Sequence, residues 1–246
     1  MLLSWTVSWS GKFTCVPRSR AQALRRDPSL ASISMFEYQR KYFYQDKQIA
    51  ESYHGERFTH RRGIQRDRAL RKAMNRALQS VPDARTLLDV PWGTGRFTEF
   101  FCARGKNYFG ADISQEMLDV LARDNAARGP RSNLIRCDGE FMPFKANTFD
   151  CVVSIRLFQL IPQEAKLDIL KEMRRVSNRW LIVECMYPPS MRAFGKTRYV
   201  LYKLLRLDKA MPVLDQDIVD AGWKEFKRIP LKGMKNWIGI YRKTGS

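Results

Sequence analysis

The sequence predicts a doubly wound α/β domain with a mostly parallel sheet, and three observations support this. Short apolar runs alternate with helix-like segments through the middle of the chain. The first run, 86–90, contains Asp89 and passes into a turn with Gly93 and Gly95, which leads into an amphipathic segment. A second acid, Asp112, follows the next apolar run. A strand, a glycine turn and a helix, with an acid after the second strand, are typical of a nucleotide-binding α/β domain.

Further elements alternate as expected for βαβ units. The first strand is expected at 86–90. Six more are expected at 108–111, 133–137, 148–155, 180–184, and in a closing hairpin of 226–230 with 236–241. Ser114 is expected to cap a helix that runs to about residue 128. Pro162 opens a second helix that ends near Ser177. Phe97, Phe100 and Phe101 are expected to bury one face of the helix after the glycine turn.

The ends of these strands carry a set of motifs. They are Asp89-x-Pro91-x-Gly93-x-Gly95, Ala111-Asp112-Ile113-Ser114, Cys137-Asp138-Gly139-Glu140-Phe141-Met142-Pro143-Phe144 and Phe149-Asp150-Cys151-Val152-Val153-Ser154. In residues 84–187 the chain resembles the class I S-adenosylmethionine (SAM)-dependent methyltransferases, in the group that includes the ubiquinone and menaquinone C-methyltransferases. The resemblance implies a Rossmann-like fold with a seven-stranded, mostly parallel sheet, a late antiparallel strand, helices on both faces and a helical N-terminal cap.

The resemblance also implies a cofactor, SAM, and a role for each matching residue. Gly93, Thr94 and Gly95 would approach its methionine and ribose parts, and Asp89 would hold its amino group. Asp112 would bind the ribose. The remaining implied contacts are Ile113 on the adenine, Asp138 and Gly139 near the adenine amino group, and Ser154 at the border of the methyl-transfer site.

The chain departs from the usual family pattern at two positions. Pro91 stands where the family most often has its first glycine, and Trp92 fills a position that is usually small. We expect the indole to crowd the methionine part of the pocket. This departure keeps open a protein that binds SAM without catalysis.

A dinucleotide-dependent oxidoreductase is the main rival for a glycine turn followed by an acid. That fingerprint needs a third glycine, and Thr98 stands there. A pyrophosphate also disfavours a carboxylate such as Asp89 directly before the turn. SAM has no phosphate and carries a sulfonium and an ammonium group, so a carboxylate at this position favours its binding. The other rival is a nucleotide-free α/β domain whose acids only cap helices.

The net charge of +19 is concentrated outside the central domain. Residues 1–85 hold 17 Lys and Arg against 7 Asp and Glu, and residues 191–246 hold 13 against 5. Residues 86–190 are nearly balanced, with 14 against 13. The basic flanks indicate an anionic partner: a phosphorylated or carboxylated small molecule, an anionic membrane surface, or RNA as the second choice. The alternative is a solvated basic face.

Three segments are expected along the chain: residues 1–34 as a disordered or spurious extension, 35–83 as a helical basic cap, and 84–246 as the methyltransferase domain. A basic amphipathic insertion at about 190–209 is expected to lie on an anionic membrane, to line an apolar pocket with a basic rim, or to pack as a cap helix. We expect a cytoplasmic protein, either free or in peripheral contact with a membrane. The acid-poor start of the chain also fits an organellar transit peptide, so organellar targeting is the alternative.

The cysteine spacing and the lengths of the apolar runs argue against a metal site and a membrane-spanning segment. The five cysteines are scattered singly, and no zinc-ligand spacing occurs, so no metal site is expected. No apolar run approaches the ~20 residues of a membrane span.

The expected reaction is an in-line displacement at the SAM methyl group, with a small, lipid-like or aromatic, anionic acceptor. Alignment of the two reactants supplies much of the rate. Arg156 and Gln159, just after the fourth strand, are placed to orient the acceptor, and His54 or His60 is a candidate base. Ser154-Ile155-Arg156-Leu157 stands where amine-methylating nucleic-acid enzymes often carry Asn/Asp-Pro-Pro-aromatic, which disfavours that route. An RNA methyltransferase remains the alternative enzyme.

Overall fold

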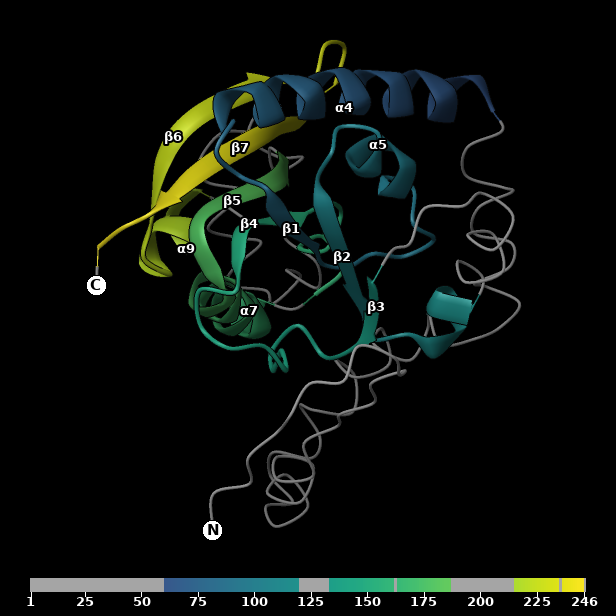
Figure 1. The fold of residues 1–246 in the computed structure, drawn as a ribbon. Coiled ribbons are helices and arrows are strands. Elements are labelled where there is room, and N and C mark those ends of the chain that lie inside the picture. Colours follow the sequence, from purple (N-terminus) through teal and green to yellow (C-terminus); the bar gives the residue numbers. More distant parts are fainter. Residues whose placement is uncertain (1–59, 120–132, 162, 187–214, 235, 246) are drawn as a thin grey trace, which may run out of the picture.

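The computed structural model describes residues 60–119, 133–161, 163–186, 215–234 and 236–245. Within them, one seven-stranded sheet has the order β3-β2-β1-β4-β5-β7-β6, with helices on both faces (Figure 1). β1 to β5 are parallel, and β7 runs antiparallel between β5 and β6. The predicted fold class is therefore confirmed, including the late antiparallel strand.

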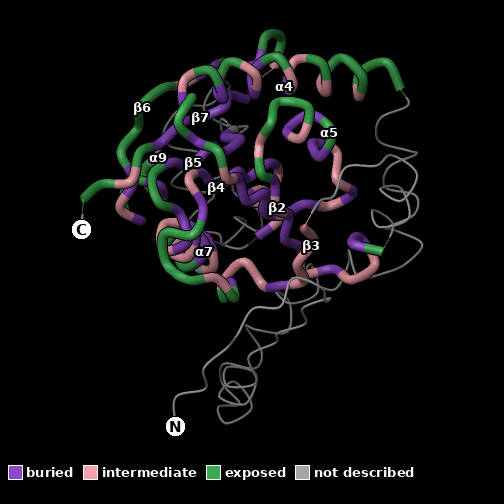
Figure 2. Tube along the Cα trace, viewed as in Figure 1, coloured by how far each residue is buried: buried purple, intermediate pink, exposed green. Residues whose placement is uncertain are grey.

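The strands lie close to their predicted places. Their bounds are β1 Thr86–Asp89, β2 Asn107–Asp112, β3 Asn133–Arg136, β4 Phe149–Ser154, β5 Ser177–Met186, β6 Trp223–Pro230 and β7 Asn236–Lys243. The central strands are buried on both faces, as a parallel sheet covered by helices requires (Figure 2). β5 is longer than predicted, because its pairing with β7 extends from Trp180 to Met186.

One face of the sheet is covered by α4 (Arg61–Ser80) and by α5 (Thr98–Cys102). The buried positions of α4 recur at helical spacing and form one stripe: Leu70, Ala73, Met74, Ala77 and Leu78. Ile64, near the start of the same helix, lies outside this stripe and is 37% exposed. α5 has only five residues. Phe97, Phe100 and Phe101 are nevertheless buried, as predicted.

The other face is covered by α7 (Gln163–Val176) and by α9 (Asp215–Asp220). Ile169, Leu170 and Met173 of α7 pack with the sheet and with Ile218 of α9. The two helices and the strands enclose a second core on this side. α7 matches the helix predicted at 162–177 within a residue at each end.

Several predictions fall on residues outside the described ranges: the extension at 1–34, the cap up to residue 59 with His54, the helix beyond residue 119, and the insertion at 190–209. Among the described residues, no helix is long and apolar enough to cross a membrane. Among the described residues, Cys102, Cys137, Cys151 and Cys185 are free thiols, and the last three are buried.

Candidate active site

The glycine turn after β1 lies across the carboxyl ends of its two neighbouring strands. The Val90 amide donates to the Val153 carbonyl at 2.9 Å, and the Trp92 amide donates to the Ala111 carbonyl at 2.9 Å. Gly93 has a φ of +59°, which glycine adopts without strain. A Cβ at Gly93 would meet no atom within 4 Å. The backbone of the turn therefore borders open space at the edge of the sheet where the predicted acids lie.

Asp112 at the end of β2 is held by two backbone amides. Its Oδ2 accepts from the Gly93 amide at 2.8 Å, and its Oδ1 accepts from the Ser114 amide at 2.9 Å. The side chain is buried, and this burial raises the pKa of Asp112 although both hydrogen bonds lower it. Ser114 caps the next helix as predicted, since its Oγ accepts from the Met117 amide at 3.0 Å. The carboxylate is thus fixed directly beside the glycine turn.

Asp89 at the end of β1 is the second buried acid. It is 3% exposed and accepts a short hydrogen bond from the Tyr108 hydroxyl at its Oδ2. Its Oδ1 is buried and has no hydrogen-bond partner among the described residues. Burial raises the pKa of Asp89 to about 7, and Asp112 adds to this, whereas Tyr108 and Arg96 oppose it. Asp89 is therefore a carboxyl group with one oxygen held and the other able to accept from a ligand.

Trp92 does not take the place expected of it. Its indole is 3% exposed and packs in the core on the α4 side of the sheet. A Cβ at Gly110 would lie 1.7 Å from an indole carbon, so the ring lies against the backbone of β2 where only glycine leaves room. Its Nε1 donates to Thr98 Oγ1 at 2.9 Å. The expectation that the indole crowds the methionine pocket was wrong, because the missing side chain at Gly110 gives it a place in the core.

The other residues implied to bind the cofactor lie along the same edge. Pro91 and Thr94 belong to the turn, and Ile113 directly follows β2. Asp138 and Gly139 follow β3, where Asp138 Oδ1 accepts from the Glu140 amide at 3.1 Å. Since β1, β2 and β3 are parallel neighbours, their carboxyl ends bring these residues together. Their binding roles stay predictions.

The end of β4 carries the three residues expected near the acceptor. Ser154 is fully buried, and its Oγ has no hydrogen-bond partner among the described residues. Arg156 adopts a φ of +66°, a left-handed conformation that is uncommon outside glycine. In the amide orientation that satisfies both groups, Gln159 Oε1 accepts from Arg156 Nε and Nη2, each at 3.1 Å. Arg156 and Gln159 therefore form one hydrogen-bonded pair two residues beyond Ser154. His60 is exposed at the start of α4.

A clamp from α4 onto the glycine turn was missed by sequence reasoning. Arg71 donates from Nε to Asp67 Oδ2 at 2.6 Å and from Nη2 to the Arg96 carbonyl at 2.8 Å. Arg96 Nε lies 3.3 Å from Asp67 Oδ1. The guanidinium groups of Arg71 and Arg96 lie 5.4 Å and 4.7 Å from the Phe97 ring centre. α4 therefore holds the residues that directly follow Gly95, and its i, i+4 Asp–Arg pair was the available signal.

A third buried acid lies near the carboxyl end of β5. Glu184 accepts at Oε1 from Arg66 Nη2 of α4 at 2.9 Å and from Asn236 Nδ2 of β7 at 2.6 Å. Its Oε2 is buried without a hydrogen-bond partner among the described residues. An acid at the end of an apolar strand is itself unusual. Glu184 joins α4, β5 and β7 on the same face of the sheet as Asp89.

Comparison with known proteins agrees with this geometry. Residues 87–179 match the model of a methyltransferase domain family. The chain is 32% identical over 124 residues to the demethylmenaquinone methyltransferase of Clavibacter sepedonicus, and this aligned region covers 50% of each chain. It is 35% identical over 83 residues to a probable 18S rRNA (guanine-N(7))-methyltransferase of Dictyostelium discoideum, 34% of this chain and 28% of that one. The chain thus spans about half or less of the length of these relatives.

A likeness to solved structures supports the fold. The magnesium protoporphyrin IX methyltransferase of Synechocystis, solved with bound SAH, aligns with a TM-score of 0.54 at 15% identity, covering 74% of this chain and 84% of that one. The sheet order and the antiparallel β7 are those of class I methyltransferases. Residues 87–179 therefore match a methyltransferase domain family, and the sheet that contains them has the class I methyltransferase fold.

Proposed function

We propose that this protein transfers a methyl group from SAM to a small anionic acceptor. The observation that carries the proposal is the pair of buried carboxyl groups, Asp89 and Asp112, on either side of a glycine turn that borders open space. Burying an acid without a cation is unfavourable, and burial raises the pKa of both groups. Such a site favours a cationic ligand and disfavours a phosphate.

The residues fit SAM in particular. Asp89 Oδ1 is a buried acceptor without a hydrogen-bond partner among the described residues, and an ammonium group would supply its hydrogen bond. Asp112 keeps lone pairs beyond its two amide bonds and would accept from ribose hydroxyls. Gly93 leaves the ligand room against the backbone. SAM, when bound, supplies a methyl group on a positively charged sulfur.

The protein's part in the reaction is to bind, orient and exclude water. Ser154 Oγ, which is buried and has no partner within the part of the chain that the structure describes, borders the strand end at which the acceptor would lie. The Arg156–Gln159 pair would orient a carboxylate, phosphate or carbonyl of the acceptor. Arg156 stays protonated and therefore orients and does not take a proton. A hydroxyl acceptor needs a base, for which His54 remains the candidate.

Titration calorimetry with SAM tests the cofactor half of the proposal. Replacing Asp112→Ala removes the only carboxylate held by the Gly93 amide and should abolish measurable SAM binding. The matched control is Asp119→Ala, an exposed acid one helical turn after the Ser114 cap, which should bind normally. Unchanged SAM affinity in Asp112→Ala would contradict the proposal.

The acceptor half of the proposal is tested by supplying methyl-labelled SAM and a host extract to the protein and then separating small-molecule, lipid, RNA and protein fractions. We expect the label in the small-molecule or lipid fraction.

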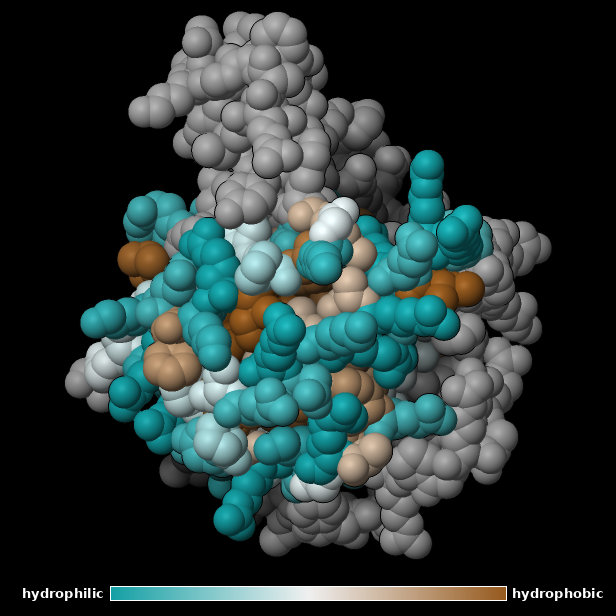
Figure 3. Space-filling view, turned by 90° about the horizontal axis from the view of Figure 1, so that it is seen from above, coloured by the Kyte–Doolittle hydropathy of each residue, from teal (hydrophilic) through white to brown (hydrophobic). Residues whose placement is uncertain are grey.

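RNA is the second candidate acceptor, and the solvent face of α4 is the observation that favours it. Exposed basic residues follow one another along this helix, namely Arg61, Arg62, Arg68, Lys72 and Arg76. The acid on the helix, Asp67, is engaged by Arg71 and Arg96. Figure 3 looks down on this face and shows mostly hydrophilic side chains. A helix of 20 residues extends the positive charge over about 30 Å.

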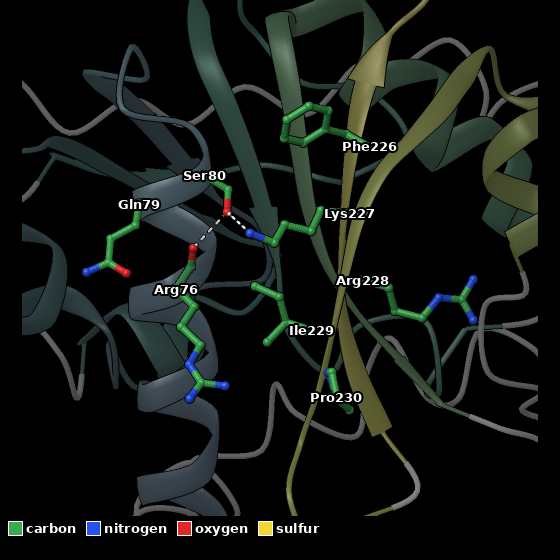
Figure 4. Close-up of a pocket in the computed structure, with 8 residues that line it drawn as sticks. All are labelled: Arg76, Gln79, Ser80, Phe226, Lys227, Arg228, Ile229 and Pro230. Carbon is green, nitrogen blue, oxygen red and sulfur yellow. Dashed lines mark hydrogen bonds between the residues drawn. The ribbon is translucent and has the colours of Figure 1, made fainter.

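A groove of about 560 Å³ continues this basic surface between the last turn of α4 and the edge strand β6. In Figure 4, Lys227 reaches across to α4, where its Nζ donates to Ser80 Oγ at 3.0 Å. Arg76 extends along the helix, and the Phe226 ring is 53% exposed. A groove lined both by cations and by an exposed ring suits a single strand, whose bases stack and whose phosphates pair with the cations.

Fluorescence anisotropy with a single-stranded oligoribonucleotide tests this second candidate. Phosphate contacts make affinity fall steeply with salt, and each lost contact reduces the slope by about one. Arg76→Ala should therefore bind more weakly with a shallower slope, while Lys145→Ala, exposed in the loop before β4, should not. Binding that does not depend on salt would exclude RNA as the acceptor.

A further inference from the structure

Four buried side chains lie in a line beneath the glycine turn, with a hydrogen bond at each end of the line. Trp92 Nε1 donates to Thr98 Oγ1 at 2.9 Å. The Thr98 side chain faces the Tyr108 hydroxyl, whose pKa it lowers against the larger raising effects of burial and Asp89, and the Tyr108 hydroxyl donates to Asp89 Oδ2. Each of the four residues is only 2% or 3% exposed. The line joins the turn, α5, β2 and β1, and it ends at the carboxylate whose other oxygen has no partner in the described ranges.

The two ends of the line fix the direction of every hydrogen bond in it. An indole N–H only donates, so Thr98 Oγ1 accepts from Trp92 and its own proton is left for the Tyr108 oxygen. An ionised carboxylate only accepts, so the Tyr108 proton points to Asp89. Hydrogen bonds ordered in one direction polarise one another and stabilise negative charge at the last acceptor.

Packing holds the first member of the line in place. The indole of Trp92 lies against Gly110, where a Cβ would be 1.7 Å away, and meets the Tyr108 ring edge to face at 5.7 Å between centres. The tryptophan that departs from the family pattern therefore has a defined partner, Thr98, at the position where a dinucleotide fingerprint would have its third glycine.

We propose that Tyr108 is a positioning residue for the cofactor: oriented by Thr98 and Trp92, its hydroxyl holds Asp89 Oδ2 so that Oδ1 faces the ammonium group of SAM. This inference rests on the proposed function and deepens it. The other charged groups that face Asp89 are Asp112 from the end of β2 and Arg96 from the segment after the turn. Tyr108 is the group that bonds the carboxylate directly.

The test compares Tyr108→Phe with the wild-type protein in calorimetric titrations. Losing a hydrogen bond to a charged group should weaken SAM binding roughly ten- to hundredfold. Decarboxylated SAM keeps the ammonium and should show the same loss. 5′-Methylthioadenosine lacks the amino-acid part and should bind both proteins equally. Tyr241→Phe is the matched control, because it removes a buried phenol hydroxyl from the opposite face of the sheet and should bind SAM normally.

The pH dependence separates positioning from general damage. The Tyr108 hydrogen bond favours ionised Asp89, so its removal raises the pKa of Asp89 further. The loss of SAM affinity should then be larger at pH 6 than at pH 7.5, where more Asp89 is ionised in both proteins. A loss from altered packing would be the same at both values of pH.

Thr98→Val provides a second variant that keeps the side-chain shape. It should weaken SAM binding less than Tyr108→Phe, and the double variant should match Tyr108→Phe alone, because Thr98 acts through Tyr108. Equal SAM affinities of the wild-type protein and Tyr108→Phe would overturn the assignment. An equal loss of affinity for 5′-methylthioadenosine in Tyr108→Phe would overturn it as well. A wild-type protein that does not bind SAM at all would overturn the proposed function and this inference with it.

Discussion

Replacing Asp89→Asn should stabilise the protein without cofactor at neutral and higher pH. The pKa of this carboxyl is raised from 3.8 to about 7, chiefly by burial. Between pH 5 and 7 the unfolded chain has lost the proton and the folded protein keeps it. Stability therefore falls as pH rises through this range, by about 1.4 kcal/mol per pH unit for one such group. Over two units the free energy of unfolding should fall by about 3 kcal/mol and then level off above pH 7.

The assay is urea unfolding of the wild-type protein and Asp89→Asn at pH 5 and pH 8 without SAM. The variant lacks this fall, so the difference in the free energy of unfolding between the two proteins should change by about 3 kcal/mol between the two values of pH. Asn accepts the Tyr108 hydrogen bond but buries an amide, which costs about 1–2 kcal/mol at both values of pH. Asp112 is present in both proteins, and its repulsion of ionised Asp89 is part of the fall that Asp89→Asn removes.

Asp150→Asn is the matched control with the opposite sign. Partial burial raises the pKa of Asp150, but hydrogen bonds from Thr86 and Arg85 outweigh this and lower it overall. The carboxylate accepts from the Arg85 amide, the Thr86 amide and the Thr86 hydroxyl, each at 2.9 Å. Its replacement should destabilise the protein at both pH 5 and pH 8. An Asp89→Asn protein with the same pH dependence as the wild type would refute the reasoning about burial at this site.

Two further changes test the packing around the glycine turn. Gly110→Ala places a Cβ 1.7 Å from the Trp92 indole. We therefore expect the free energy of unfolding in urea to fall by about 3 kcal/mol or more, and adding Trp92→Leu should largely restore it. A Gly110→Ala variant as stable as the wild type would contradict the position of the indole. Arg71→Met removes the donor to the Arg96 carbonyl and should weaken SAM binding several-fold with about 1 kcal/mol lost in stability. Arg68→Met, an exposed neighbour on α4, should change neither, and equal effects of the two would contradict the clamp.

The sheet was predictable because its signals are local. Apolar runs mark β1 to β4 within a residue or two, and acids at the ends of successive parallel strands have to meet at one edge. Asp89, Asp112 and Asp138 could be placed in this way before their surroundings were known. The length of α5 was not predictable, because its phenylalanines are buried by packing under α4 whether or not the helix continues.

The partners of these acids depend on contacts between distant segments. Tyr108 was placed as a strand residue, but its bond to Asp89 follows from the parallel register in which Asp89 pairs with Gly110. Trp92 was expected to obstruct the site because the sequence alone does not place its indole against Gly110, where the missing side chain leaves room for the ring. Arg66 and Glu184 are 118 residues apart, and only the packing of α4 on the sheet joins them.

The number of protons released when SAM binds tests the central claim most directly. At pH 6.5, calorimetric titrations in two buffers of different ionisation enthalpy measure this number. With a pKa of about 7, most Asp89 is protonated in the free protein, and pairing with an ammonium ionises it. The account predicts release of roughly 0.7 proton per SAM, absent in Asp89→Asn. SAM binding without proton release, or with equal release by Asp89→Asn, would contradict the claim that this buried carboxyl group receives the cofactor's ammonium.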